Sequence, residues 1–379
     1  MGIKVFMMGG RRCGKTSVLA SMFDQFVKGP ANKFFTINNQ TALEHDKKSP
    51  ITGVLEDQDD LLSKKYELMD KLEKYNTSTF LVDSGPTYCI WSYTLRMAIP
   101  GHPRKKTTID FIDCPGEFFQ KGEHYPIVQQ YMQDCDVFVI VVDTPYLMEG
   151  GEVVAQAVNC VDSVQNFVSS IDNNGGQYAK MVMFVPIKCE KWVHEGRINE
   201  VVNKIKTEYA VPIQTACAYR RMNVCILPVE TAGNIIFSEL KDPYTITTGG
   251  ETKKCCKLTD RLVRLADGTA YTIADGDILN TDAQAIIPGT TLPRPHSWFH
   301  INPNADPLKL YAPHNCDQLP LHILSFMTKK MSVEGEGPFW AWIFGEISRK
   351  EMESKMREMN KAHLIKEGVD GIVYLKKDI

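Results

Sequence analysis

A glycine-rich segment near the N-terminus of this 379-residue chain has the residue types and spacing of a phosphate-binding loop. The pattern G-x-x-x-x-G-K-[ST] is met by Gly9, Gly10, Arg11, Arg12, Cys13, Gly14, Lys15 and Thr16, and Ser17 follows. The glycines of such a loop let several backbone N–H groups converge on one phosphate, and the positive end of the next helix adds to the attraction. The Lys15 ammonium would reach the β- and γ-phosphates, and the Thr16 hydroxyl would ligate Mg²⁺. The segment therefore predicts a nucleoside triphosphate site with Mg²⁺ as its cofactor.

A second segment, "TTIDFIDCPGEFF", carries an acidic residue that suits the same metal ion. Asp113 stands at the carboxyl end of an expected strand over 107–112, which is where parallel α/β sheets place their ligands. A carboxylate at this point can hold Mg²⁺ through a water molecule. Gly116, three residues further on, could donate its N–H to a γ-phosphate. We therefore predict that Thr16 and Asp113 share the magnesium site.

In these two motifs the chain resembles a P-loop GTPase of the translation-factor-related class, which includes Ras-like and elongation-factor-like GTPases. Asp113-Cys114-Pro115-Gly116 matches the third motif of that family. The resemblance covers about residues 1–236 and resumes in an expected last helix over 318–331. It implies an α/β fold of the P-loop NTPase type, with a mainly parallel sheet flanked by helices, and GTP or GDP as the ligand.

The family reads guanine with an N/T-K-x-D motif, and this chain has Ile187-Lys188-Cys189-Glu190 at the corresponding place. Lys188 matches, and its aliphatic stem could lie over the base. Glu190 replaces the aspartate, but a carboxylate still accepts hydrogen bonds from guanine N1–H and the 2-amino group, at about 1.5–3 kcal/mol each. Ile187 cannot form the polar link to the phosphate loop that an amide would form. We therefore expect guanine recognition with weak affinity.

Two further motifs of the resemblance are assigned by their order in the chain. Thr231-Ala232, in "PVETAGN", fits the last family motif, so that the Ala232 N–H could meet guanine O6. The threonine that senses the γ-phosphate through Mg²⁺ should precede the second strand of the sheet. We assign this role to Thr87, with Thr79 as its competitor.

The residues expected to act in hydrolysis depart from the family pattern. Glu117 follows Gly116 where relatives commonly have Gln or His to orient water. A carboxylate can accept a hydrogen bond from water, but its charge opposes the γ-phosphate unless a cation compensates. Arg11 and Arg12 are candidates for that cation, as arginine fingers are in other enzymes, and the alternative for each is exposure to solvent. We expect slow hydrolysis.

Continuous apolar runs alternate with helical spacing along most of the chain, which is typical of a parallel sheet buried on both faces. The expected strands are 3–8, 88–99, 107–112, 137–142, 181–187 and 224–229, and the expected helices between them are 15–26, 152–171 and 197–209. Two stretches, at about 30–86 and 240–312, do not fit this pattern and are predicted to be insertions, the second with a hairpin around Asp267-Gly268. The GTPase-like domain is thus expected to span residues 1–331, followed by a helical appendage over 332–379.

Composition excludes some classes of function. The chain has 43 basic and 46 acidic residues, a net charge of −3, so bulk electrostatics favour neither nucleic acid nor an anionic membrane. No apolar stretch reaches the roughly 18 residues of a membrane-spanning helix. Eleven cysteines without a C-x-x-C pair indicate a reduced, cytoplasmic protein.

These features together favour a GTP-binding switch with slow, Mg²⁺-dependent hydrolysis, in other words a GTPase, that acts on a protein effector or regulator. Glu117 and the divergent guanine motif are similar to bacterial GTPases of conflict systems. Two alternatives stay open. One is a nucleotide-dependent scaffold that does not hydrolyse, and the other is an ATPase whose guanine site has decayed.

Overall fold

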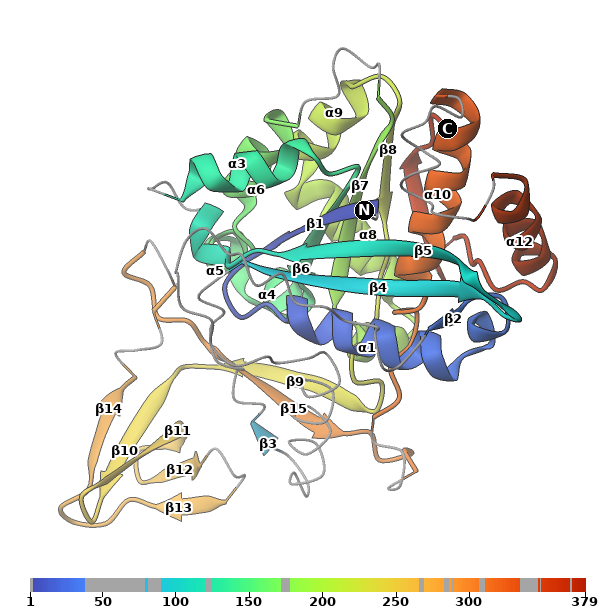
Figure 1. The fold of residues 1–379 in the computed structure, drawn as a ribbon. Helices are drawn as coiled ribbons and strands as arrows, with labels where there is room; N and C mark the ends of the chain where they lie inside the picture. Colours follow the sequence, from blue (N-terminus) through green and yellow to red (C-terminus); the bar gives the residue numbers. More distant parts are fainter. Residues whose placement is uncertain are drawn as a thin grey trace.

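An eight-stranded sheet forms the centre of the protein in the computed structural model (Figure 1). The structure describes residues 3–37, 79–80, 90–119, 124–171, 178–265, 269–282, 286–287, 290–306, 311–334, 347, 349–368 and 370–379. In spatial order the strands are β16 (Val373–Lys376), β8 (Met222–Ile226), β7 (Lys180–Ile187), β6 (Val137–Asp143), β1 (Ile3–Gly9), β5 (His102–Asp113), β4 (Trp91–Ile99) and β2 (Thr36–Ile37).

The five inner strands from β8 to β5 run parallel, and β1 lies among them between β6 and β5. Val5 of β1 pairs with Phe111 of β5 on one side and with Val137 of β6 on the other. The outer strands β4, β2 and β16 are antiparallel to their neighbours. The runs that form β6 and β7 are buried at every position, as strands covered on both faces must be. The predicted α/β fold with a mainly parallel sheet is therefore confirmed.

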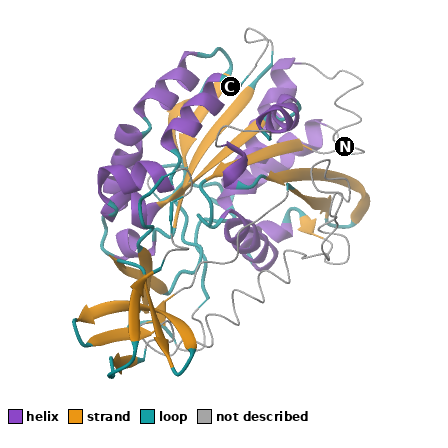
Figure 2. Cartoon of the chain, turned by 90° about the vertical axis from the view of Figure 1, so that its left-hand side faces the viewer, coloured by secondary structure: helices purple, strands orange, loops and turns teal. Residues whose placement is uncertain are grey.

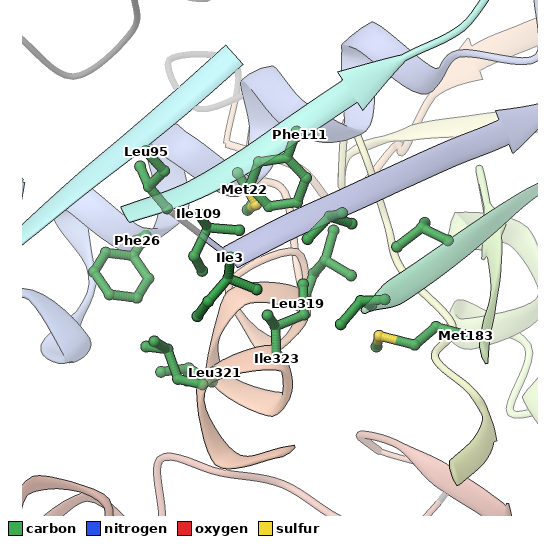
Figure 3. Close-up of a cluster of buried hydrophobic side chains, with 14 of the residues drawn as sticks. Ile3, Met22, Phe26, Leu95, Ile109, Phe111, Met183, Leu319, Leu321 and Ile323 are labelled. Atoms are coloured by element: carbon green, nitrogen blue, oxygen red, sulfur yellow. The ribbon is translucent and has the colours of Figure 1, made fainter. Parts of the chain in front are cut away.

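Helices cover both faces of this sheet because successive side chains of each strand point to opposite faces. On one face Ile3, Val5 and Met7 of β1 pack against α1 (Lys15–Lys28), α10 (Gln318–Glu334) and α12 (Arg349–Lys361). Figure 3 shows Ile3 beside Leu319 and Ile323 of α10 in this cluster. On the other face Phe6 and Met8 pack against a second layer of helices. That layer contains α3 (Tyr125–Gln133), α4 (Thr144–Glu149), α6 (Val161–Ser169), α7 (Glu190–His194), α8 (Ile198–Glu208) and α9 (Ala210–Ala218).

The helix expected over 152–171 is broken into two, and that expectation was wrong. α5 (Gly151–Val158) ends before Asn159, and α6 starts after Cys160, whose φ of 53° is left-handed. Asn159 is buried at the break, where its Oδ1 accepts a hydrogen bond from the Asp143 N–H at 2.7 Å. The break thus ties the helical layer to the end of β6, next to the phosphate loop.

A region rich in β-structure follows the main sheet's last parallel strand (Figures 1 and 2). One sheet has five strands in the order β13 (Ala270–Thr272), β12 (Leu262–Leu265), β11 (Glu251–Thr259), β10 (Tyr244–Thr248) and β14 (Ile278–Thr281). The other has the order β3 (Thr79–Phe80), β15 (His296–Ile301) and β9 (Ile235–Lys241). The expected hairpin is the antiparallel β12–β13 pair, whereas most of the other strands in this region gave no sequence signal.

The last part of the chain contains α12 and, unexpectedly, a strand. β16 pairs with β8, the outermost of the parallel strands, so that Tyr374 lies opposite Cys225. Residues 335–346 of the predicted appendage and most of the first predicted insertion lie outside the described residues. The proposed bounds of both insertions and of the appendage stay predictions.

Candidate functional site

The phosphate-loop motif connects the central strand to the helix that follows it. β1 ends at Gly9 and α1 begins at Lys15, after Gly14 in a left-handed conformation with φ of 105°. A Cβ on Gly10 would lie 2.0 Å from the Val158 carbonyl oxygen, so only glycine allows this close approach at the α5–α6 break. Cys13 is fully buried, and burial raises the pKa of its thiol, so it packs as an apolar group. Ser17 lies partly buried in the first turn of α1.

The Lys15 side chain folds back over the loop. Its ammonium donates to the carbonyl oxygens of Gly9 at 3.3 Å and Gly10 at 3.4 Å, and the residue is buried. These are long hydrogen bonds for a charged donor, whose bonds to anionic oxygens are shorter and stronger. A phosphate at the loop would therefore be a better partner for Lys15 than the two carbonyls.

Thr16 and Asp113 meet at the start of α1 and the end of β5. The Thr16 hydroxyl donates to Asp113 Oδ2 at 2.9 Å. Burial raises the pKa of the Asp113 carboxyl, and the Lys15 ammonium and the Thr16 hydrogen bond oppose this effect. The other carboxyl oxygen, Oδ1, is buried without a hydrogen-bond partner among the described residues.

That unpartnered oxygen is what a hydrated Mg²⁺ would satisfy, so these residues fit the predicted metal ion. Within the described residues there is no group of three or more His, Cys, Asp or Glu side chains that could hold a metal. A magnesium ion here would be held by Thr16 and, through water, by Asp113.

The Asp113-Cys114-Pro115-Gly116 turn brings its glycine onto the phosphate loop. A Cβ on Gly116 would lie 2.4 Å from the Arg11 backbone nitrogen and 2.9 Å from the Gly9 carbonyl oxygen. Glu117 follows in the short helix η2 (Gly116–Phe119). Thr87 lies outside the described residues, and its competitor Thr79 lies in β3.

Both arginines of the loop are partly exposed, and Arg12 has a left-handed backbone with φ of 59°. Such a conformation costs a non-glycine residue on the order of 1–3 kcal/mol. It also places successive N–H groups on one side of the chain, as in anion-binding loops. The roles of Arg11 and Arg12 in hydrolysis stay predictions.

Replacing Arg12 with glycine should raise the free energy of unfolding by up to about 1 kcal/mol, because the relief of strain exceeds the extra chain entropy of glycine. Arg11→Gly is the matched control. Arg11 is not among the residues with positive φ, so glycine there should destabilise the protein. Urea unfolding of the two variants measures both effects, and a destabilised Arg12→Gly protein would contradict the strain argument.

The lysine of the divergent base motif is held by a buried carboxylate. Lys188 has a left-handed backbone, with φ of 58°, and its ammonium lies 2.7 Å from Asp143 Oδ2 at the end of β6. Ile187 does touch the phosphate loop, because its Cδ1 lies 2.8 Å from where a Cβ on Gly14 would be. The contact is apolar, so Ile187 packs against the loop without a polar link to it.

Glu190 and the Thr231-Ala232 segment lie together, as a base site requires. Glu190 is only 2% exposed, and its Oε1 accepts hydrogen bonds from the backbone N–H of Ala232 at 2.8 Å and Gly233 at 3.2 Å. Burial raises the pKa of Glu190 to about 7, against the lowering effect of the Ala232 N–H. The sequence assigns the Ala232 N–H to guanine O6 and the Glu190 carboxylate to guanine N1–H. In the structure these two groups are hydrogen-bonded to each other.

The loop that carries Ala232 is fixed from its far side. The Ser21 hydroxyl of α1 donates to the Thr231 carbonyl oxygen at 2.8 Å, and Ala232 O accepts a hydrogen bond from the Ala312 N–H at 2.9 Å. Both Thr231 and Ala232 are buried. The backbone N–H groups of this loop are therefore held in place beside Glu190.

The sequence did not predict the presence of two residues at the site, Asp143 and Arg294. Asp143 follows a buried strand just as Asp113 does, so the same rule could have found it. Arg294 reaches the Arg11 carbonyl from the second predicted insertion, and nothing in its local sequence indicates this contact.

The fold and this site define a mixed α/β protein with a phosphate-loop motif at the end of its central strand. No protein-family model and no curated protein sequence matches the chain. Among the described residues no helix is both long and apolar enough to cross a membrane.

Some solved structures are similar at low identity. One is the signal recognition particle receptor SRb-GTP/SRX complex from Chaetomium thermophilum, at 12% identity and a TM-score of 0.33, covering 62% of this chain and 92% of that one. Another is the S. cerevisiae Ski7 GTPase-like domain bound to GTP, at 12% identity and a TM-score of 0.34, covering 81% of this chain and 72% of that one. The same domain bound to GDP and inorganic phosphate gives 10% identity and a TM-score of 0.31. Similarity at this level does not decide the function.

Proposed function

We propose that the protein is a GTP-binding switch with slow, Mg²⁺-dependent hydrolysis. The observation that carries the proposal is the meeting of Thr16 and Asp113 at 2.9 Å beside the buried Lys15 ammonium. A buried cation, a hydroxyl and a carboxylate with an unpartnered oxygen suit a triphosphate and its metal ion. The residues of the base motif follow β7 and β8, whose carboxyl ends lie at the same edge of the parallel sheet as the end of β1.

In this proposal the residues of the chain bind and orient the triphosphate. The loop N–H groups and Lys15 hold the phosphates, and the Gly116 N–H faces the terminal one. When bound, Mg²⁺ would withdraw charge from the phosphate oxygens. Glu117 would orient the attacking water, and Arg11 or Arg12 would offset its charge, as the sequence predicts.

Base recognition in this proposal is guanine-selective but weak. A guanine that used both the Glu190 carboxylate and the Ala232 N–H would have to displace the 2.8 Å hydrogen bond between them. A hydrogen bond to a charged group contributes about 1.5–3 kcal/mol net, so its loss would weaken guanine binding by about that free energy. The same observation favours the second candidate, an ATPase in which Glu190 only stabilises the Ala232 loop.

Titration with Mg²⁺–GTP, GDP and Mg²⁺–ATP tests the proposed function. Tighter binding of GTP than of ATP is expected, whereas equal binding would favour the ATPase. A single-turnover assay with bound GTP then separates a slow GTPase from a scaffold that does not hydrolyse. The proposal extends to a cytoplasmic location and to a protein effector or regulator of this switch, as for the bacterial conflict-system GTPases that the sequence resembles.

Guanine selectivity should depend on pH through Glu190. The carboxyl must be ionised to accept two hydrogen bonds from the base, and its pKa is about 7. At one pH unit below the pKa about one Glu190 carboxyl in ten is ionised. GTP affinity should therefore be about tenfold lower there than at a pH where the carboxyl is fully ionised. Titrations between pH 6 and pH 8 measure this.

Glu190→Gln is the control for that experiment, because its amide oxygen can still accept from Ala232 but does not titrate. The GTP affinity of this variant should change with pH only as the nucleotide itself titrates, and its preference for GTP over ATP should be smaller. Equal pH profiles in the two proteins would exclude Glu190 as the group that reads guanine.

A further inference from the structure

A buried arginine from the second predicted insertion contacts the phosphate loop directly. Arg294 Nη1 donates a hydrogen bond to the Arg11 carbonyl oxygen at 2.7 Å, across 283 positions of the chain. The residue is only 6% exposed. Hydrogen bonds from a guanidinium are strong, and burial reduces their competition with water.

Tyr146 of α4 fixes the orientation of this guanidinium. The Arg294 guanidinium carbon lies 5.1 Å from the centroid of the Tyr146 ring, and Nε donates to the Tyr146 hydroxyl at 3.3 Å. That hydroxyl in turn donates to the Pro295 carbonyl oxygen at 2.5 Å. Because α4 follows Asp143 at the end of β6 directly, Arg294 is held through Tyr146 by the main sheet as well as by its own segment.

The contact determines how one peptide of the loop is turned. The C=O of Arg11 and the N–H of Arg12 belong to the same planar trans peptide and point in opposite directions. With the carbonyl directed at Arg294, the Arg12 N–H must point to the other side of the loop. The left-handed conformation of Arg12, φ 59°, is the one that groups neighbouring N–H donors around an anion.

We propose that Arg294 is a positioning residue of the phosphate loop, which holds the Arg11–Arg12 peptide with its N–H turned toward the bound phosphate. The inference rests on the nucleotide-binding function proposed above. In this proposal the segment before β15 is part of the site. A change in the conformation of this segment then alters the affinity for phosphate, and phosphate binding shifts the conformation of the segment by the same coupling free energy.

Arg294→Ala should weaken the binding of Mg²⁺–GTP and of GDP about tenfold, equal to about 1.4 kcal/mol. Millimolar guanidinium chloride should restore affinity in this variant, because a free guanidinium can occupy the space and donate to the Arg11 carbonyl. A purely structural role would lower the melting temperature without such rescue.

Arg264→Ala is the matched control. Arg264 of β12 also stacks on an aromatic ring, with its guanidinium carbon 5.5 Å from the Trp298 centroid, but in the β-rich region. Its removal should leave nucleotide affinity unchanged and should show no response to guanidinium.

Unchanged affinity in Arg294→Ala, or equal losses in both variants, would overturn the inference. If Arg294→Ala does not fold, Arg294→Lys serves instead, because an ammonium can contact the Arg11 carbonyl or the Tyr146 hydroxyl but not both in the same geometry. A two- to fivefold loss is then expected, and no loss would overturn the inference. If the unaltered protein binds no GTP or GDP, the proposed function fails first, which is a distinct result.

Discussion

Replacing Lys15 with alanine is expected to weaken Mg²⁺–GTP binding by at least tenfold, about 1.4 kcal/mol. The ammonium is buried and lies 3.3 and 3.4 Å from two loop carbonyl oxygens, so it has no strong anionic acceptor within the loop itself. A triphosphate would supply such acceptors, and the alanine variant could not use them. Isothermal titration with Mg²⁺–GTP measures the loss.

Lys28→Ala is a suitable control for this experiment, since Lys28 is the last residue of the same helix α1. Its ammonium pairs with Asp24 at 2.9 Å at an exposed position, so its removal should affect GTP affinity little. A folded Lys15→Ala protein with the GTP affinity of the unaltered chain would exclude Lys15 as a phosphate ligand.

Much of this site could be predicted because its residues carry local signals. The phosphate loop has fixed spacing between a buried strand and a helix, and Asp113 follows an apolar run at the edge where parallel strands end. The structure brings Thr16 and Asp113 together, and also Glu190 and Ala232, in agreement with their order in the chain.

The contacts that could not be predicted depend on residues far apart in sequence. Apolar spacing continues through Asn159, so periodicity gives one helix, whereas in the structure the chain breaks at the point where Gly10 approaches the Val158 carbonyl. Arg294 is a single arginine between two prolines, without a pattern that could link it to Arg11. β16 is a short strand of partly buried residues, so it lacks the continuous apolar run that identified β6 and β7.

The divergent base motif shows a further limit of sequence patterns taken one residue at a time. The sequence assigns Glu190 and Ala232 separate contacts with guanine, whereas in the structure each is the hydrogen-bond partner of the other. Their spatial proximity was implied by the resemblance, but the hydrogen bond between them, which competes with binding of a base, was not. Such competition can be seen only when both groups are placed.

The second large effect is expected for Asp113→Asn, which should lower single-turnover GTP hydrolysis about 100-fold, equal to about 2.7 kcal/mol. Asparagine has the size of aspartate, and its amide oxygen can still accept the hydrogen bond that Thr16 now donates to Asp113 at 2.9 Å. The fold should therefore persist. What is lost is the negative charge and the buried oxygen that a hydrated magnesium ion would use.

The same strand provides a matched control for this substitution. Asp110 of β5 also accepts a hydrogen bond from a threonine, Thr94 of β4, at 2.7 Å, but it precedes the end of the strand by three residues. Asp110→Asn should leave both hydrolysis and the Mg²⁺ dependence of GTP binding unchanged. For Asp113→Asn, GTP affinity should rise little as Mg²⁺ is increased from micromolar to millimolar concentrations, whereas the unaltered protein should bind more tightly. If Asp113→Asn retains the full Mg²⁺ dependence of GTP binding, the metal ion is held elsewhere, and Asp113 serves only to fix the start of α1 through Thr16.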